Sequence, residues 1–118
     1  MSLTGKEEDF LHLLIDIGTP RNVATVLVYL AHTPSATSRA IRCCTDLEPS
    51  EISAALQYLL RQGWIESRES KTLVRGRPIR IFVLIQPIPV IVDSIEREKM
   101  KEIENQIQVI RKLRDGMS

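Results

Sequence analysis

The most constraining feature of this sequence is a helix-break-helix pattern between residues 38 and 62. Ser38–Cys44 predicts a short helix, Thr45–Pro49 a polar break, and Ser50–Gln62 a strongly amphipathic helix. The second helix carries a complete apolar stripe at helical spacing, formed by Ile52, Ala55, Leu56, Leu59 and Leu60. This periodicity predicts that one face of the helix packs on a core and that the other faces solvent.

A β-hairpin is predicted directly after these helices. Gly63 is expected to end the second helix, and the apolar runs Trp64–Ser67 and Ile79–Ile85 are expected to form two strands. The segment between them, Arg68–Pro78, is a basic loop in which Gly76 permits the turn. Apolar residues alternate regularly in the second strand, at Ile79, Ile81, Val83 and Ile85.

This order of elements is the layout of a winged helix-turn-helix, a mainly α fold with a small β-hairpin wing (α+β). In that layout one helix enters the major groove of DNA and the hairpin lies beside it. Short side chains early in Ser50–Gln62 permit close approach, and longer polar side chains can reach base edges or phosphates. The candidate recognition residues are Ser50, Ser53, Ala54, Gln57, Tyr58 and Arg61. The first helix of the pair is expected to contribute Ser38 and Arg39, and the wing Lys71, Arg75, Arg77 and Arg80.

Positive charge is concentrated in the part of the chain that contains this motif. The whole chain has a net charge of only +1, but residues 61–80 carry six basic and two acidic residues, a net charge of +4. By contrast, residues 1–16 carry a net charge of −3, and residues 93–115 balance to zero. Release of counterions from DNA phosphates requires such a local basic patch. The charge distribution therefore favours double-stranded DNA as the partner.

Two further helices are expected before this motif. The first, Gly5–Ile17, starts with a capping box of Thr4 and Glu7. Its predicted buried face consists of Phe10, Leu11, Leu14 and Ile17. The second runs from Pro20 to about His32, with Thr19 as its predicted N-terminal cap. Its predicted apolar side consists of Val23, Ala24, Leu27, Leu30 and Ala31.

A long terminal helix is predicted after the proline-rich boundary Gln86–Pro89. It covers Val90–Met117 and carries a short heptad seam, interrupted by Arg114, of Met100, Ile103, Ile107, Ile110 and Met117. The preferred interpretation is self-association into a homodimer through this seam. The alternative is that the helix packs back on the first helix. The expected domains are thus a DNA-binding domain over residues 1–86, and a linker with a dimerisation helix over residues 87–118.

The motif resembles the compact archaeal and bacterial winged helix-turn-helix transcription regulators, especially the MarR-like group. The resemblance covers about residues 20–85 and rests on the order and spacing of four segments. These segments are 37–41, 47–53, 59–65 and 76–78. The resemblance implies a three-helix core with a wing, a homodimer, and operator binding by two copies of the second motif helix. The chain departs from the group at Glu48 and Ala54, near which such regulators often place basic residues.

Other function classes find little support in the sequence. No apolar stretch approaches the roughly 20 residues of a membrane span, and the acidic start is unlike a secretory signal. No nucleophile motif, phosphate loop or metal-ligand cluster is present, so we expect a protein that is not an enzyme and needs no cofactor. The two adjacent cysteines cannot form a disulfide framework, which fits a reducing cytoplasm. Cys43 and Cys44 diverge by about 100° on a helix, which disfavours a shared metal ion. Buried structural cysteines are the preferred interpretation, with metal or redox sensing as alternatives.

Two functions from different classes remain open at this point. The first is a homodimeric, sequence-specific regulator that binds double-stranded DNA. The second is a winged-helix module that binds a protein of the transcription machinery, which Glu48, Glu51 and the near-neutral total charge favour. An adaptor that dimerises through the final helix alone is a third possibility. The sequence identifies no small-molecule ligand.

Overall fold

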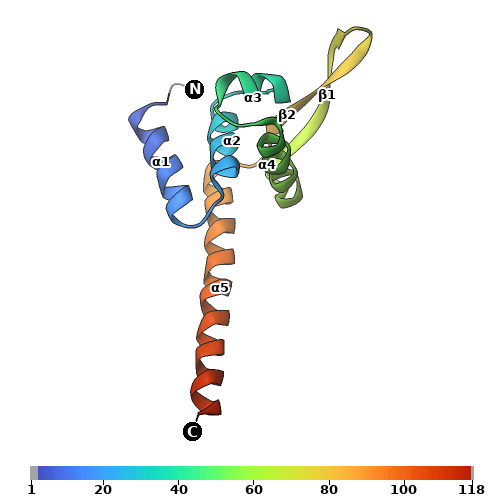
Figure 1. Ribbon diagram of the computed structural model, residues 1–118. Helices are drawn as coiled ribbons and strands as arrows, with labels where there is room; N and C mark the ends of the chain where they lie inside the picture. Colours follow the sequence, from blue (N-terminus) through green and yellow to red (C-terminus); the bar gives the residue numbers. More distant parts are fainter. Residues whose placement is uncertain (1–2, 118) are drawn as a thin grey trace. The chain divides into compact units, whose positions relative to one another are not determined.

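The computed structural model describes residues 3–117 and divides the chain into two compact units, Met1–Gln86 and Pro87–Ser118. The elements, shown in Figure 1, are α1 (Gly5–Asp16), α2 (Arg21–Ala31), α3 (Ser38–Cys44), α4 (Pro49–Gln62), β1 (Ile65–Val74), β2 (Arg77–Leu84) and α5 (Ile88–Gly116). Within residues 3–117, five helices and a two-stranded antiparallel hairpin confirm the predicted mainly α fold with a β-hairpin wing.

Helix α1 begins where the sequence predicts, but it buries less of its apolar face than expected. The Thr4 Oγ1 atom accepts a hydrogen bond from the Glu7 backbone N–H at 3.2 Å, which caps the helix. Of the four residues predicted to be buried, only Leu14 is; Phe10 and Leu11 are half-buried and Ile17 is exposed. The prediction of a fully buried face is wrong because α1 packs mainly against one element, α2.

Helix α2 is the centre of the first unit, in contact with α1, α4 and β2. Every residue from 26 to 30 is buried, as are Val23 and Ala24, whereas Ala31 is exposed. The buried surface is therefore broader than the predicted single side, because neighbours surround the helix. The predicted Thr19 cap is wrong: Pro20 is the N-cap residue, with no side-chain cap. The backbone N–H of Thr19 instead donates to the Leu14 carbonyl at 3.0 Å, in the turn that follows α1.

Helix α4 packs its apolar stripe against α2 and ends at Gly63, as predicted. Gly63 has a φ of 75°, the left-handed conformation that glycine adopts at little cost. The stripe is one residue narrower than predicted. Leu59 is 0% exposed, but its neighbour Leu60 is 37% exposed and faces away from the core.

The two strands are longer than predicted, and most of the expected loop Arg68–Pro78 is strand. Pairing runs from Ile65 opposite Leu84 to Val74 opposite Arg77, with an irregularity between Glu69 and Leu73. Arg75 and Gly76 form the turn at the tip, as predicted, with φ values of 52° and 76°. Positive φ at both central residues is what a two-residue type I′ hairpin requires.

The base of the hairpin completes the core of the first unit. Trp64 is buried immediately before β1 rather than within it, and Ile65 is buried at the start of the strand. The predicted alternation in β2 fails at Phe82, which is buried together with its neighbour Val83. The reason is an additional backbone bridge, in which Ala36 and Phe82 exchange hydrogen bonds of 3.1 and 2.8 Å.

The second unit consists of α5, which begins two residues earlier than predicted and ends at Gly116. Pro87 is its N-cap residue and Pro89 lies in its first turn, where a missing N–H costs no intrahelical hydrogen bond. All five residues of the predicted seam are exposed, and Val109 and Leu113 add to the exposed apolar surface. None of the helices in residues 3–117 combines the length and the apolar character needed to cross a membrane.

The adjacent residues Leu59 and Leu60 test this assignment of the core. Leu59→Ala is expected to lower the free energy of unfolding by about 2–5 kcal/mol because it leaves a buried cavity. Leu60→Ala is expected to cost less than about 1 kcal/mol because the side chain is already partly solvated. Urea denaturation at matched protein concentration measures both values, and equal losses would contradict the outward orientation of Leu60.

Candidate nucleic-acid interface

The turn between α3 and α4 is held by short-range hydrogen bonds. The Thr37 Oγ1 atom caps α3 by accepting from the Ala40 N–H at 3.0 Å. At the other end of α3, the Thr45 hydroxyl donates to the Ile41 carbonyl at 2.8 Å and accepts from the Leu47 N–H at 3.4 Å. These contacts fix the chain direction between the two helices of the motif.

The N-terminus of α4 is fixed by its own glutamates and by α2. Glu48 is the N-cap residue, and its backbone N–H donates to the Glu51 carboxylate at 3.0 Å. The Asn22 side chain on α2 donates to the Glu51 carbonyl oxygen at 2.9 Å. Both glutamates therefore serve the helix start, where negative charge also suits the helix dipole.

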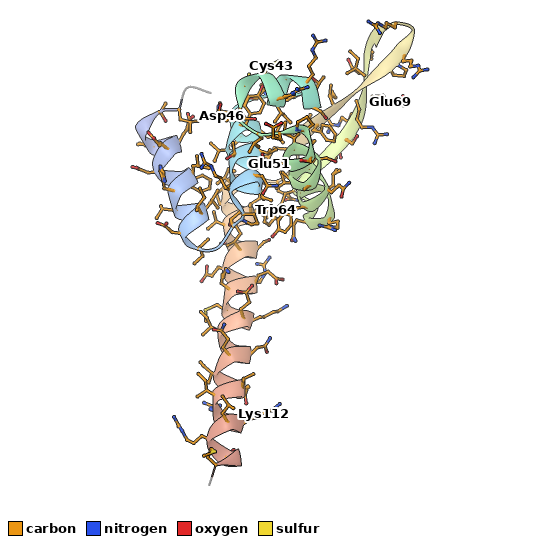
Figure 2. The ribbon with its side chains drawn as sticks, in the orientation of Figure 1. Cys43, Asp46, Glu51, Trp64, Glu69 and Lys112 are labelled. Carbon is orange, nitrogen blue, oxygen red and sulfur yellow. The ribbon has the colours of Figure 1, made fainter. Side chains whose placement is uncertain are left out.

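The outward face of α4 carries most of the predicted recognition residues. Ser50, Ser53, Ala54, Gln57 and Arg61 are all exposed, and helical geometry places them within about 100° of arc. Tyr58 is different. It is half-buried, and its ring packs edge-to-face on Trp64 with ring centroids 6.2 Å apart. Tyr58 thus supports the junction between α4 and β1 through its contact with Trp64, which is labelled in Figure 2.

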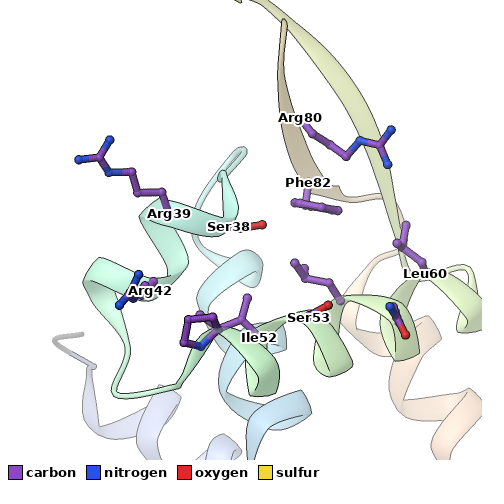
Figure 3. Close-up of a pocket in the computed structure, with 11 residues that line it drawn as sticks. Ser38, Arg39, Arg42, Ile52, Ser53, Leu60, Arg80 and Phe82 are labelled. Atoms are coloured by element: carbon purple, nitrogen blue, oxygen red, sulfur yellow. The ribbon is translucent and has the colours of Figure 1, made fainter. Parts of the chain in front are cut away.

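A groove of about 760 Å³ lies between α3, α4 and β2. Its floor is apolar and is made by Pro49, Ile52, Leu56, Leu60 and Phe82. Arg39 and Arg42 lie on the α3 side and Arg80 on the β2 side, with Ser53 on α4 (Figure 3). The predicted residues Ser38 and Gln57 also line this groove. The structure thus gathers residues from three segments along one concave surface.

Two contributions to the groove were not predicted from the sequence. Arg42 follows Arg39 by three residues on α3, so the two side chains share a helix face. This spacing in the sequence could have identified Arg42 as a groove residue. Leu60 was assigned only to the apolar stripe of its helix, and Phe82 was given no role from the sequence, although both line the groove. Among residues 3–117, no ion pair is described for Arg39, Arg42 or Arg80, so their charges face solvent.

The wing carries the remaining predicted residues beyond the groove. Lys71, Arg75 and Arg77 are exposed along the hairpin, and no ion pair within the described part of the chain engages them. Arg68 is engaged locally, because its Nε–H donates to the carboxylate of Glu66. The free positive charge of the hairpin therefore lies toward its tip and at Arg80.

The two cysteines lie at the end of α3. Cys43 is exposed (Figure 2) and Cys44 is half-buried, so the prediction of buried structural cysteines is wrong for Cys43. The Tyr29 hydroxyl donates to the Cys44 Sγ atom at 3.7 Å. Burial of the ring, reinforced by this contact, raises the pKa of Tyr29. Within residues 3–117, no three His, Cys, Asp or Glu residues are arranged to hold a metal ion.

The MarR family model matches residues 17–72, which run from the end of α1 into β1. Over these residues the chain resembles the MarR family, and its fold is that of a winged helix-turn-helix protein. Members of this family are transcription regulators rather than enzymes, which agrees with the prediction that the chain is not an enzyme. A search of curated protein sequences gave no match.

Solved structures show the same fold at low sequence identity. TrmBL2, an archaeal chromatin protein, superimposes with a TM-score of 0.68 at 12% identity over 95% of this chain. The MarR-like chain spans only 40% of TrmBL2. The MarR family transcription regulator SP03579 gives a TM-score of 0.56 at 18% identity, covering 95% of this chain and 78% of that one. A transcriptional regulator homologue from Pyrococcus horikoshii OT3 gives 0.51 at 14% identity, covering 86% and 97%.

The N-terminal cap of α4 can be tested by replacing Glu51, which both accepts a hydrogen bond and carries a negative charge at the start of the helix. Glu51→Ala is expected to lower the free energy of unfolding by about 0.5–2 kcal/mol, because the Glu48 N–H loses its acceptor. Glu51→Gln is the matched control, since its amide oxygen can accept the same hydrogen bond without the charge. Urea denaturation of both variants separates the two contributions; a Gln variant as unstable as the Ala variant would show that charge, not the hydrogen bond, stabilises this end.

Proposed function

We propose that this MarR-like chain is a cytoplasmic, homodimeric transcription regulator that binds specific sequences in double-stranded DNA. The observation that carries the proposal is the groove bordered by α3, α4 and β2, with arginines on two of its sides. Arg39, Arg42 and Arg80 are spaced across a surface from which α4 presents Ser53 and Gln57. Basic residues at the margins position a duplex through its phosphates, while side chains on the central helix read base edges.

The wing supports the same proposal. Its tip residue Arg75 has a left-handed backbone (φ 52°), which costs a non-glycine residue about 1–2 kcal/mol. Asparagine or glycine would satisfy this turn with less strain. A strained, exposed arginine beside exposed Lys71 and Arg77 is consistent with a role in contacting phosphate or the minor groove.

The alternative of a protein-binding module loses its main support in this geometry. Glu48 and Glu51 favoured an acidic contact surface in the sequence, but both lie in the cap of α4. TrmBL2, a structural relative, is a protein that binds DNA, and two other relatives are described as transcription regulators or their homologues. These likenesses favour the DNA-binding role for residues 1–86.

Homodimer formation is the proposed role of residues 87–118. The apolar residues along α5 are exposed, with Met100, Ile103 and Ile107 between 42% and 52% accessible. A row of apolar side chains at heptad spacing is stabilised when a second helix covers it. A dimer would also present two copies of α4 to the two halves of an operator.

The primary test is fluorescence anisotropy of the protein with duplex DNA from upstream of its own coding sequence, across a range of salt concentrations. Binding is expected to weaken linearly on a log-log plot, with a slope of about 0.9 per phosphate contact. Absence of binding even at low salt would overturn the DNA proposal and redirect the search to protein partners.

Arg75→Asn is expected to change binding and stability in opposite directions. The loss of one phosphate contact weakens binding to every duplex and lowers the salt slope by about one. Asparagine tolerates the left-handed turn, so the free energy of unfolding stays equal or rises by up to about 1 kcal/mol. Arg68→Asn is the control of equal charge change, and it should leave the slope nearly unchanged because Arg68 is paired with Glu66. Equal effects of both variants would indicate that only total charge matters.

Gln57→Ala is expected to change which sequence is preferred rather than how binding depends on salt. A glutamine that reads a base edge contributes about 1–3 kcal/mol of discrimination at one base pair. Selection from a randomised duplex library with both proteins measures the preference, and salt titration measures the slope. A lower salt slope with an unchanged preferred sequence would contradict a base-reading role.

A further inference from the structure

The heptad pattern of α5 places charged residues on the same seam as its apolar residues. Extending the spacing of Met100 and Ile103 in both directions brings Asp93, Glu96 and Arg114 onto the seam. All three are exposed, and no ion pair is described for any of them within residues 3–117. Charges inside a helix seam are unfavourable unless the partner helix brings an opposite charge to them.

We infer that the apolar seam of α5 is covered by α5 of a second copy of this chain, antiparallel, with Arg114 opposite Glu96 of the second copy. This inference rests on the homodimer of the proposed function and adds the direction and register of its helices. By symmetry the pair of charges occurs twice. The same register sets Met100 opposite Ile110 and Ile103 opposite Ile107, so that the four central apolar residues of the seam meet one another. Asp93 and Met117 meet at the two ends of the pair, where both are exposed to solvent.

A parallel pair is disfavoured by the seam itself. In register, it would set Arg114 beside Arg114 and Glu96 beside Glu96, and the two copies of Asp93 would also meet. Like charges that face each other within a seam oppose association. The parallel pair would gain one favourable flanking ion pair, between Lys99 and Glu104 of the other copy. An interaction within the single chain competes with this ion pair. The Lys99 Nζ atom already pairs with Glu102 of its own helix at 3.0 Å.

The flanks of the antiparallel pair are compatible with this register. Lys99 would lie beside Leu113 of the second copy, whose side chain is 66% exposed in the single chain. The methylene groups of a lysine can cover such an apolar side chain while the ammonium group stays in water. Glu104 would meet Glu104 of the second copy, and Arg97 would lie beside Arg111, but these flanking positions are exposed to solvent, where like charges repel only weakly.

The charge pair also selects one register among the antiparallel ones. Sliding one helix by seven residues puts Arg114 opposite Ile103 in one direction and opposite Pro89 in the other. Either shift leaves Arg114 without an opposite charge on the seam. The register with Glu96 overlaps residues 93–117 and so covers the whole exposed seam.

Cysteine cross-linking tests the direction of the helices in the full chain. In a Cys43→Ser/Cys44→Ser background, the variants are Met100→Cys, Ile110→Cys and the two combined. After mild oxidation, the antiparallel register predicts disulfide-linked dimers for the combined variant and none for either single variant. In the antiparallel pair, two copies of residue 100 lie about 15 Å apart along the helix axis, beyond the reach of a disulfide. Cross-linking of each single variant would show a parallel pair, which overturns this inference but leaves the homodimer in place.

Charge reversal tests the register. Glu96→Arg and Arg114→Glu are each expected to raise the dimer dissociation constant by about tenfold or more in analytical ultracentrifugation. The double variant restores the opposite charges and is expected to return to within about threefold of the unmodified chain. A dimer whose double variant stays as weak as the single variants overturns the register. A chain that is monomeric at every concentration overturns the homodimer itself, and DNA binding measured in parallel reports separately on the first unit.

Discussion

The packing of α4 against α2 determines which face of α4 is presented outward, and the proposed recognition of DNA depends on that face. Leu59 is fully buried at this contact, and a buried leucine side chain contributes about 1.5–3 kcal/mol relative to an exposed one. Because one face of α4 is committed to the core, the opposite face must present Ser53 and Gln57 outward. The hydrogen bond from Asn22 to the Glu51 carbonyl then fixes the start of the helix relative to α2. A rotation of α4 about its axis would bury polar groups without partners, which is costly.

Interactions between residues close in sequence determine which charged side chains remain free to contact a partner. The chain has 16 basic and 15 acidic residues, and several of them are used close to where they lie in sequence. Glu66 engages Arg68, Glu102 engages Lys99, and Glu51 completes the cap of α4. What remains is a group of exposed arginines around the groove and at the wing tip. A nearly neutral protein can therefore present a local positive surface, which is what phosphate contacts require.

Sequence patterns located the elements well where the periodic signal was strong. The bounds of α3 were predicted to the residue, and those of α4 to within one residue, because apolar spacing and terminal residues agreed. The hairpin arms were underestimated, since residues 68–78 have few apolar side chains and their pairing depends on backbone hydrogen bonds to the opposite strand. Leu60 was assigned to the core stripe of α4 for a related reason. A pattern shows that a side chain is apolar, but not whether another element covers it.

The sequence alone determined the order of the elements, the outward polar face of α4, the glycine turn of the wing and the heptad spacing of α5. These features follow from local periodicity, capping and backbone conformation, which neighbouring residues control. Only the tertiary structure decided that Arg39, Arg42 and Arg80 border one groove, and that Tyr58 packs on Trp64. It also decided that α1 leaves Ile17 exposed. These outcomes depend on contacts between residues distant in sequence, whose geometry is set by how the helices and hairpin pack together.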